Sequence, residues 1–172
     1  MEDQNPYRSP ESAITDVAVM GDANLAGRGE RFGASLIDGL IMGVIIFPLM
    51  FVGGYWSAVM TAASEGHQVA IGTMLLWGVI GFAVLIVVQG IPLHASGQTW
   101  GKKMLGIKIV DLSGAKPSLG RLLGLRYLPL QVIANVPVIG PLAMIVDPLL
   151  IFRDDRRCGH DLIAGTQVVK AE

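Results

Sequence analysis

Three long stretches without a Lys, Arg, Asp or Glu side chain set the pattern of this chain. They cover residues 39–64, 68–101 and 127–146, and the second contains one titratable residue, His94. Each reaches the roughly 20 residues that a helix needs to cross about 30 Å of hydrocarbon. A soluble protein would need a polar face on helices of this length. The pattern therefore predicts an all-α integral membrane protein, a small polytopic bundle with three or four transmembrane helices.

The first two stretches predict one transmembrane helix each. The first helix is expected over about residues 28–56, with a kink near Pro48, because proline removes a backbone hydrogen bond. The second is expected over about residues 69–90 and should end at Pro92. A short loop without Lys or Arg, residues 61–69, should connect the two.

The third stretch allows two interpretations, because Asn, Pro and Gly interrupt it near residues 135–141. Either one bent helix spans the membrane, or residues 119–134 and 138–152 form a helical hairpin that begins after Ser118, a favourable N-cap. Basic loops usually stay in the cytoplasm. With the basic loop 94–126 placed there, three spans would leave the arginines after residue 152 outside. A fourth crossing or a re-entrant segment avoids this, so we expect four helices and both termini in the cytoplasm.

Two short β-rich segments lie on the side predicted to be cytoplasmic. Residues 106–112 alternate between apolar and polar positions, and residues 166–170 are rich in β-formers. We expect the two to pair as a minor cytoplasmic β element at the membrane surface. The alternative is two irregular loops.

Charge divides the chain into two parts. Hydrophobic residues make up 52% of the sequence and charged residues 16%, against about 25% charged in soluble domains. Residues 1–28 are acidic and rich in turn-forming residues, which predicts a disordered tail. Residues 29–172 form the predicted transmembrane domain, which carries most of the bases. An acidic tail before a slightly basic membrane body argues against nucleic-acid binding, which needs a basic patch.

Ionisable residues inside or next to apolar helices are candidates for function. Arg31 and Asp38 lie seven residues apart in the first helix, so they share nearly the same face. Asp147 lies in the last apolar segment. A carboxylate in the membrane costs several kcal/mol unless it is paired, hydrated or protonated. These residues predict either a path for a proton or cation, with Arg31 as counter-charge, or a structural network of buried charges.

No motif for catalysis, a cofactor or a metal is recognisable. His160 follows Cys158 by two residues in a basic loop, which supports a catalytic pair only weakly, and His94 suits a solvated interface better than a pH-sensitive gate. Gly39 and Gly43 form a small-xxx-small pair that favours close helix contact, as in a homo-oligomer. Basic residues outside the apolar stretches are expected to set the topology and to contact lipid headgroups; they are Lys102, Lys103, Arg121, Arg126, Arg153, Arg156 and Arg157.

Three stretches together resemble the RDD family of bacterial membrane proteins, named for an Arg and two Asp. They are residues 31–38 (RFGASLID), residues 97–111 (GQTWGKKMLGIKIVD) and the segment from Asp147 through RCGHDLIAGT at residues 157–166. Arg31 and Asp38 match the family's Arg and first Asp, and Asp147 and Asp161 are both candidates for the second. The resemblance implies a multi-pass inner-membrane protein that is often suggested to take part in transport.

Two functions from different classes follow. The first is a transport-related protein that handles a small cation or proton, with Asp38 and Asp147 as ion-handling carboxylates and Asp161 as a further member of the charge network. The second is a non-catalytic membrane adaptor or assembly factor with structural buried charges. Candidate partners are membrane lipids, a second copy of the chain and another membrane protein; an enzyme is not expected.

Overall fold

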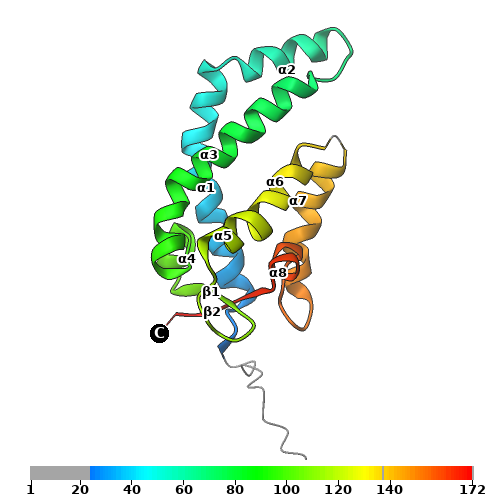
Figure 1. Cartoon of the computed structure of the whole chain (residues 1–172). Helices are drawn as coiled ribbons and strands as arrows, with labels where there is room; N and C mark the ends of the chain where they lie inside the picture. The colour runs from blue at the N-terminus through cyan, green and yellow to red at the C-terminus, as the bar shows by residue number, and fades with distance from the viewer. Residues whose placement is uncertain (1–23, 137, 172) are drawn as a thin grey trace, which may run out of the picture.

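Long helices and a small two-stranded sheet make up the computed structural model, which describes residues 24–136 and 138–171 (Figure 1). The helices α1 and α3 form the long axis, and a shorter helical hairpin lies beside them. Both strands, α4 and α8 gather at one end, called the charged end below. The elements are α1 Arg28–Val52, α2 Tyr55–Ser64, α3 Ile71–Ser96, α4 Trp100–Met104, β1 Ile107–Asp111, α5 Leu119–Arg121, the π-helical turn η2 Leu122–Tyr127, α6 Leu128–Ala134, α7 Ile139–Leu149, the 3-10 turn η3 Leu150–Phe152, α8 Gly159–Ala164 and β2 Thr166–Lys170.

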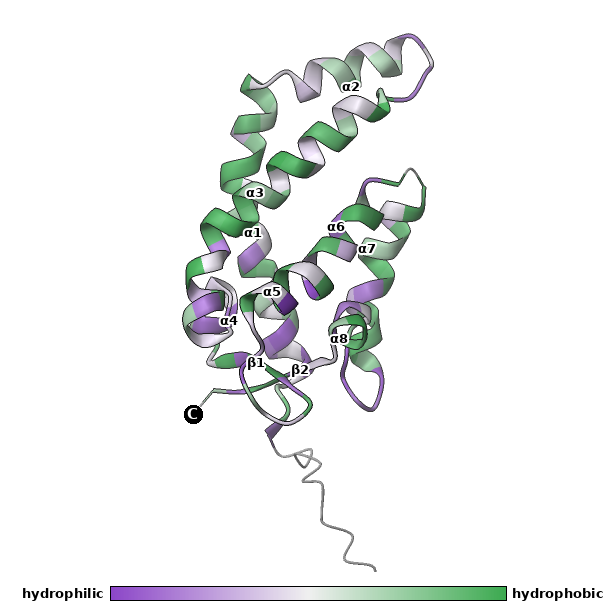
Figure 2. Cartoon of the chain, viewed as in Figure 1, coloured by the Kyte–Doolittle hydropathy of each residue, from purple (hydrophilic) through white to green (hydrophobic). Residues whose placement is uncertain are grey.

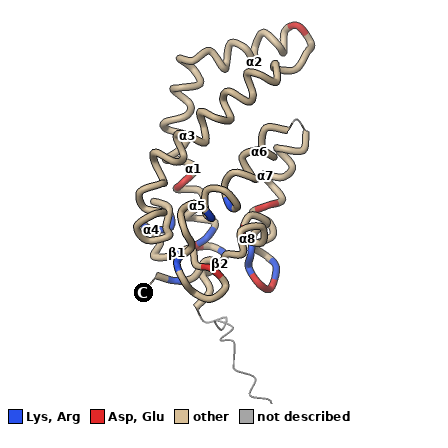
Figure 3. Tube along the Cα trace, viewed as in Figure 1, with Lys and Arg blue, Asp and Glu red and all other residues tan. Residues whose placement is uncertain are grey.

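The helices α1 and α3 are long and apolar enough to cross a membrane. They contain 25 and 26 residues, with mean hydropathies of 2.2 and 2.5 over their most apolar windows. Large apolar side chains point outward along both, including Val44, Phe51 and Val87, each about three-quarters exposed. Apolar surface of this extent is typical of a helix in contact with lipid. Figure 2 shows the apolar residues along these helices, and Figure 3 shows most of the charges at the charged end.

The first helix ends earlier than the sequence predicts. α1 stops at Val52, and Gly53 and Gly54 turn the chain before α2, which runs on to Ser64 and so includes the first part of the predicted loop 61–69. Gly54 has a φ of 79°, which favours glycine. A Cβ on Gly53 would lie 2.6 Å from the Trp77 ring, so the close approach of α3 also requires glycine there. The predicted single helix over residues 28–56 is therefore wrong at its end.

Pro92 lies inside α3 and does not end it, contrary to the prediction. The helix continues to Ser96 and stops before Gly97, which has a φ of 69°. A proline at position 92 cannot donate to the carbonyl of Val88, four residues earlier. The indole Nε1 of Trp100 donates to that carbonyl instead, at 2.8 Å. A side chain from α4 thus replaces the missing backbone hydrogen bond.

The third apolar stretch forms the predicted helical hairpin rather than one bent helix. One limb covers residues 119–134 (α5, η2 and α6), and the other covers residues 139–152 (α7 and η3). The Ser118 side chain accepts from the Arg121 backbone at 3.2 Å, which confirms the predicted N-cap. The limbs are about 24 and 21 Å long at 1.5 Å per residue. Both are shorter than α1 and α3.

The predicted strands pair as an antiparallel sheet at the charged end. Ile107 lies opposite Lys170 and Asp111 opposite Thr166. Leu25 forms a β-bridge with Val169, so the described part of the predicted tail 1–28 packs on the sheet; residues 1–23 lie outside the described residues. The core here consists of Ala26, which precedes α1, and of apolar side chains from α1, α3, the two strands and η2, namely Ala34, Leu93, Ile107, Ile109, Leu122 and Val168.

A buried charge network as candidate functional site

Asp161 is the centre of the charged end. It occupies the third residue of the short helix α8 and has no exposed surface. Its two oxygens accept from the guanidinium of Arg31 on α1 and from that of Arg126 on η2. The Thr166 hydroxyl donates to Oδ1 at 3.2 Å, and the backbone N–H of Cys158 donates to Oδ2 at 3.1 Å. Segments up to 130 residues apart in sequence therefore meet at one carboxylate.

Two arginines hold Asp161 in its charged form. Burial alone would raise the pKa of this carboxyl, but the positive charges around it, with Arg126 the strongest, hold the pKa well below its usual range. Arg31 also donates to the Arg156 carbonyl. Arg126 also donates to the Thr166 hydroxyl at 2.6 Å. Both arginines are at most 5% exposed, so the three charges form one buried unit.

Asp38 forms a second cluster, which joins α1, α3 and α4. Its Oδ1 accepts from Gln89 Nε2 at 3.0 Å and from the Gly101 backbone at 2.8 Å, and its Oδ2 accepts from the Thr99 hydroxyl at 2.5 Å. Lys102 Nζ lies 3.9 Å from Oδ2. Desolvation of Lys102, reinforced by the charge of Arg126, lowers the pKa of its ammonium to about 8.

Gly101 sets how closely α4 approaches α1. A Cβ at this position would lie 2.2 Å from the Ala34 carbonyl oxygen. Real Cβ atoms do not come this close to backbone, so no other residue fits without moving a helix. This contact explains why Asp38 receives a hydrogen bond directly from the Gly101 backbone.

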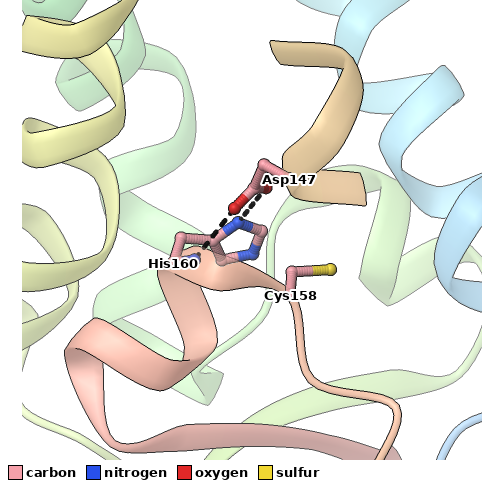
Figure 4. Close-up of side chains that lie close together, drawn as sticks. All are labelled: Asp147, Cys158 and His160. Carbon is pink, nitrogen blue, oxygen red and sulfur yellow. Dashed lines mark hydrogen bonds and ion pairs between the residues drawn. The ribbon is translucent and has the colours of Figure 1, made fainter. Parts of the chain in front are cut away.

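Asp147 and His160 form a third cluster, shown in Figure 4. The carboxylate accepts from the His160 backbone at 2.9 Å and contacts the ring Nδ1 at 2.6 Å. Arg126 lies 3.1 Å from the other ring nitrogen, Nε2. Since Arg126 can only donate, Nε2 accepts and Nδ1 carries the proton. Burial, reinforced by the charge of Arg126, lowers the pKa of His160 and favours the neutral ring.

One group of side chains has the composition of a metal site. Ligand atoms of Asp147, Cys158 and His160 lie within 4.8 Å of one another. Both ring nitrogens of His160 already have hydrogen-bond partners, and the Cys158 thiol points away from the other two side chains (Figure 4). Burial raises the pKa of that thiol to about 11, so it is a poor ligand and a poor nucleophile at neutral pH. The arrangement is satisfied by hydrogen bonds without an ion.

The structure changes the pairing expected from the sequence. Arg31, Asp38, Asp147 and Asp161 all lie toward the charged end, but the carboxylate partner of Arg31 is Asp161. The prediction that Arg31 is the counter-charge of Asp38 and Asp147 is wrong among the described contacts. The charged partner of Asp38 is Lys102, because α4 packs against α1 and covers it.

Most basic residues expected at lipid headgroups have internal partners instead. Lys102 and Arg126 are buried, so that expectation is wrong for them. Arg121 donates to the Ala164 carbonyl at 2.8 Å, and Arg157 donates to the Thr166 carbonyl at 3.0 Å. The carbonyl of Arg156 is the acceptor for Arg31. Lys103 and Arg153 are exposed and remain available to headgroups.

Several site residues were missed in the sequence. Gln89 is a lone amide within an apolar helix, and that position is a signal for a buried partner. Thr99, Tyr127 and Thr166 offer no such signal. A Cβ added at Gly39 or Gly43 would meet no other helix within 4 Å among the described residues; Gly39 is exposed, so the role of the pair in a homo-oligomer stays a prediction.

A partly open cavity of about 210 Å³ lies between the first two clusters. Its wall includes Asp38, Lys102 and His160 together with Arg126 and Tyr127. It is the place where a small ligand would meet several buried polar groups at once.

Comparison with known proteins decides the family. The model of the RDD family matches residues 25–165. The chain belongs to the RDD family. It is 31% identical over 147 residues to a Bacillus subtilis (strain 168) protein described as the uncharacterized protein YckC, with 85% of each chain covered. No solved structure matches the chain.

Membership in the RDD family agrees with the apolar character of α1 and α3, and the protein is membrane-associated. The assignment of Arg31 and Asp38 to the family's Arg and first Asp rests on the resemblance of their segment and stays a prediction. Of the two candidates for the second Asp, Asp161 is the one that contacts Arg31, while Asp147 contacts His160.

Proposed function

We propose that this RDD protein is a non-catalytic membrane adaptor or assembly factor whose buried charges hold its charged end together. The observation that carries the proposal is the position of Asp161. One carboxylate receives two arginines, a hydroxyl and a backbone N–H from α1, η2, β2 and the N-terminus of α8. Removing it would leave two buried guanidinium groups without their counter-charge.

The carboxylates have little capacity left for a cation. Each oxygen of Asp38, Asp147 and Asp161 already contacts a donor within the described chain. A cation that binds through oxygen ligands would have to displace these donors. For Asp161 it would also have to approach two arginines. A structural role needs no such rearrangement.

The proposed topology keeps the charged end in the cytoplasm. α1 and α3 cross the membrane, and the shorter hairpin enters from the cytoplasmic side and returns to it. This arrangement keeps both termini and the exposed Arg153 on one side, as the positive-inside rule requires. A single cysteine at position 154, introduced as Asp154→Cys with Cys158→Ala, tests the arrangement. A membrane-impermeant maleimide should label it in inverted vesicles and not in intact cells; labelling in intact cells would overturn the topology.

A partner would meet two kinds of surface. Within the membrane, apolar side chains on α1, α3 and α7 are exposed. At the charged end, Lys103 and Arg153 are exposed. Another membrane protein, a second copy of the chain and anionic lipids are all compatible with these surfaces.

Transport of a proton or small cation is the second candidate function. The observation that favours it is the pair of Lys102 and Asp38 at the cavity wall. A buried ammonium with a pKa of about 8 can release and regain a proton near neutral pH.

Ion flux in proteoliposomes distinguishes the two candidates. Gradients of sodium, potassium and protons would be imposed on the wild type and on Asp38→Asn, with Asp154→Asn as a matched control at an exposed position. The adaptor proposal predicts no flux above protein-free liposomes under any gradient. Flux in the wild type that is retained in Asp154→Asn and lost in a well-folded Asp38→Asn would establish transport.

A further inference from the structure

The cavity between α1, α3, α4 and η2 contains hydrogen-bond donors that the fold does not use. Arg126 is 2% exposed, and its Nε has no hydrogen-bond partner among the described residues. The hydroxyl of Tyr127, the next residue, is also buried; it lies near the Arg126 guanidinium but makes no well-aligned hydrogen bond among the described residues. Both residues line the cavity. A buried donor left without an acceptor costs about 1–3 kcal/mol, so two of them at one cavity point to a ligand that supplies acceptors.

Lys102 is a third donor that lines the cavity. Lys102 makes one ion pair, to Asp38 at 3.9 Å, which is too long for a hydrogen bond. Its ammonium can donate three hydrogen bonds. The Asp38 oxygens accept from Gln89, Thr99 and Gly101, so they are largely occupied.

The charges on the cavity wall favour a ligand with one negative charge. Lys102 and Arg126 contribute two positive charges to the wall and Asp38 one negative charge. Asp161 is shared between Arg126 and Arg31, so it neutralises only one of these two arginines. The neutral ring of His160 is preferred. A cation would meet a net positive wall. A group with two negative charges would carry more negative charge than the wall can neutralise. Oxyanions also form the strongest hydrogen bonds with ammonium and guanidinium donors.

We propose that this cavity binds an oxyanion group with a single negative charge, a phosphodiester or a carboxylate. The group would accept from Lys102 Nζ, Arg126 Nε and the Tyr127 hydroxyl. The volume of about 210 Å³ holds several water-sized groups, which is enough for such an oxyanion. Met42 and Leu85 supply an apolar part of the wall, which suits the glycerol and acyl portion of a lipid. The same chemistry is available from a lipid headgroup or from a small free anion.

Binding would be measured by native mass spectrometry and by thermal shift on detergent-purified full-length protein. The probes are short-chain phosphatidylglycerol, short-chain phosphatidylcholine, acetate and inorganic phosphate. Lys102→Gln and Tyr127→Phe remove one donor each. Their matched controls are Lys170→Gln, an exposed lysine that does not line the cavity, and Tyr55→Phe, a tyrosine outside this cavity. Tyr127→Phe removes only a hydroxyl that makes no well-aligned hydrogen bond within the described part of the chain, so the variant should fold.

Phosphatidylglycerol bound more tightly than phosphatidylcholine would identify the lipid as the source of the anion. Lys102→Gln should weaken that binding roughly tenfold or more and Tyr127→Phe roughly two- to tenfold, while both controls leave it unchanged. A thermal shift from acetate or phosphate with the same dependence on Lys102 and Tyr127 would identify a free anion instead. Binding that is absent for every probe, or equal in Tyr127→Phe, Lys102→Gln and their controls, would overturn the site. None of these outcomes depends on whether the protein transports ions.

Discussion

Replacing Asp161 by Asn should destabilise the protein strongly. The side chain keeps its shape and loses its charge, so Arg31 and Arg126 remain buried without a counter-charge. Breaking a buried ion pair by removing one partner costs about 3–5 kcal/mol. Asp161 pairs with two arginines, so the loss of stability should lie at the upper end of that range. For a chain of this length, 1 kcal/mol corresponds to roughly 2–4 °C in Tm, which gives a decrease of about 10–20 °C.

Thermal unfolding in mild detergent, followed by size-exclusion of the soluble fraction, would measure this change. Asp154→Asn is the control, because Asp154 is exposed in the nearby loop and the substitution makes the same chemical change. Surface substitutions usually change stability by no more than about 0.5 kcal/mol. A Tm for Asp161→Asn within a degree or two of that control would refute the structural role of the charge network.

Three further predictions concern the charged end. Gly101→Ala should destabilise the protein by several kcal/mol in the same thermal assay, because the added Cβ would meet the α1 backbone. Gly120→Ala should not, because a Cβ there meets nothing within 4 Å; equal Tm values for the two variants would contradict the close contact at Gly101. Between about pH 8 and 10, Lys102 binds more protons in the unfolded chain than in the folded chain. The free energy of unfolding of the wild type should therefore rise with pH relative to that of Lys102→Gln, by up to about 1.4 kcal/mol per pH unit. A difference that stays flat or falls with pH would contradict the burial of Lys102. Cys158 should react slowly with maleimide at pH 7.5 until the protein is unfolded in SDS, because the thiol is 6% exposed and its pKa is raised to about 11; fast labelling of the folded protein would contradict this.

Local sequence patterns were enough to predict the main elements. The absence of charge over residues 39–64 and 68–101 predicted the two long helices, and the alternation at residues 106–112 predicted the strand that pairs with residues 166–170. Interruptions near residues 135–141 allowed either a bent helix or a hairpin, and the distribution of the basic loops favoured the hairpin. These features depend on neighbouring residues, which is why one sequence reveals them.

Local patterns failed where a distant segment decided the outcome. A proline at position 92 usually ends a helix, but the Trp100 indole satisfies the carbonyl that the proline leaves free. Arg31 and Asp38 share a helix face, yet Arg31 pairs with a carboxylate 130 residues away. Burial of Lys102 and Arg126 likewise depends on α4 and η2 packing inward. The spacing of residues along one helix shows which face they share, but it does not show which residue from another segment each one pairs with.

The pairing of Arg31 is the central claim, and a double-mutant cycle tests it most directly. The free energy of unfolding would be measured for Arg31→Gln, Asp161→Asn and the double variant, and the same cycle would be made for Arg31 and Asp38. Our account predicts a coupling energy of about 1.5–3 kcal/mol for Arg31 with Asp161 and a value within about 0.5 kcal/mol of zero for Arg31 with Asp38. A large coupling to Asp38 and none to Asp161 would contradict it.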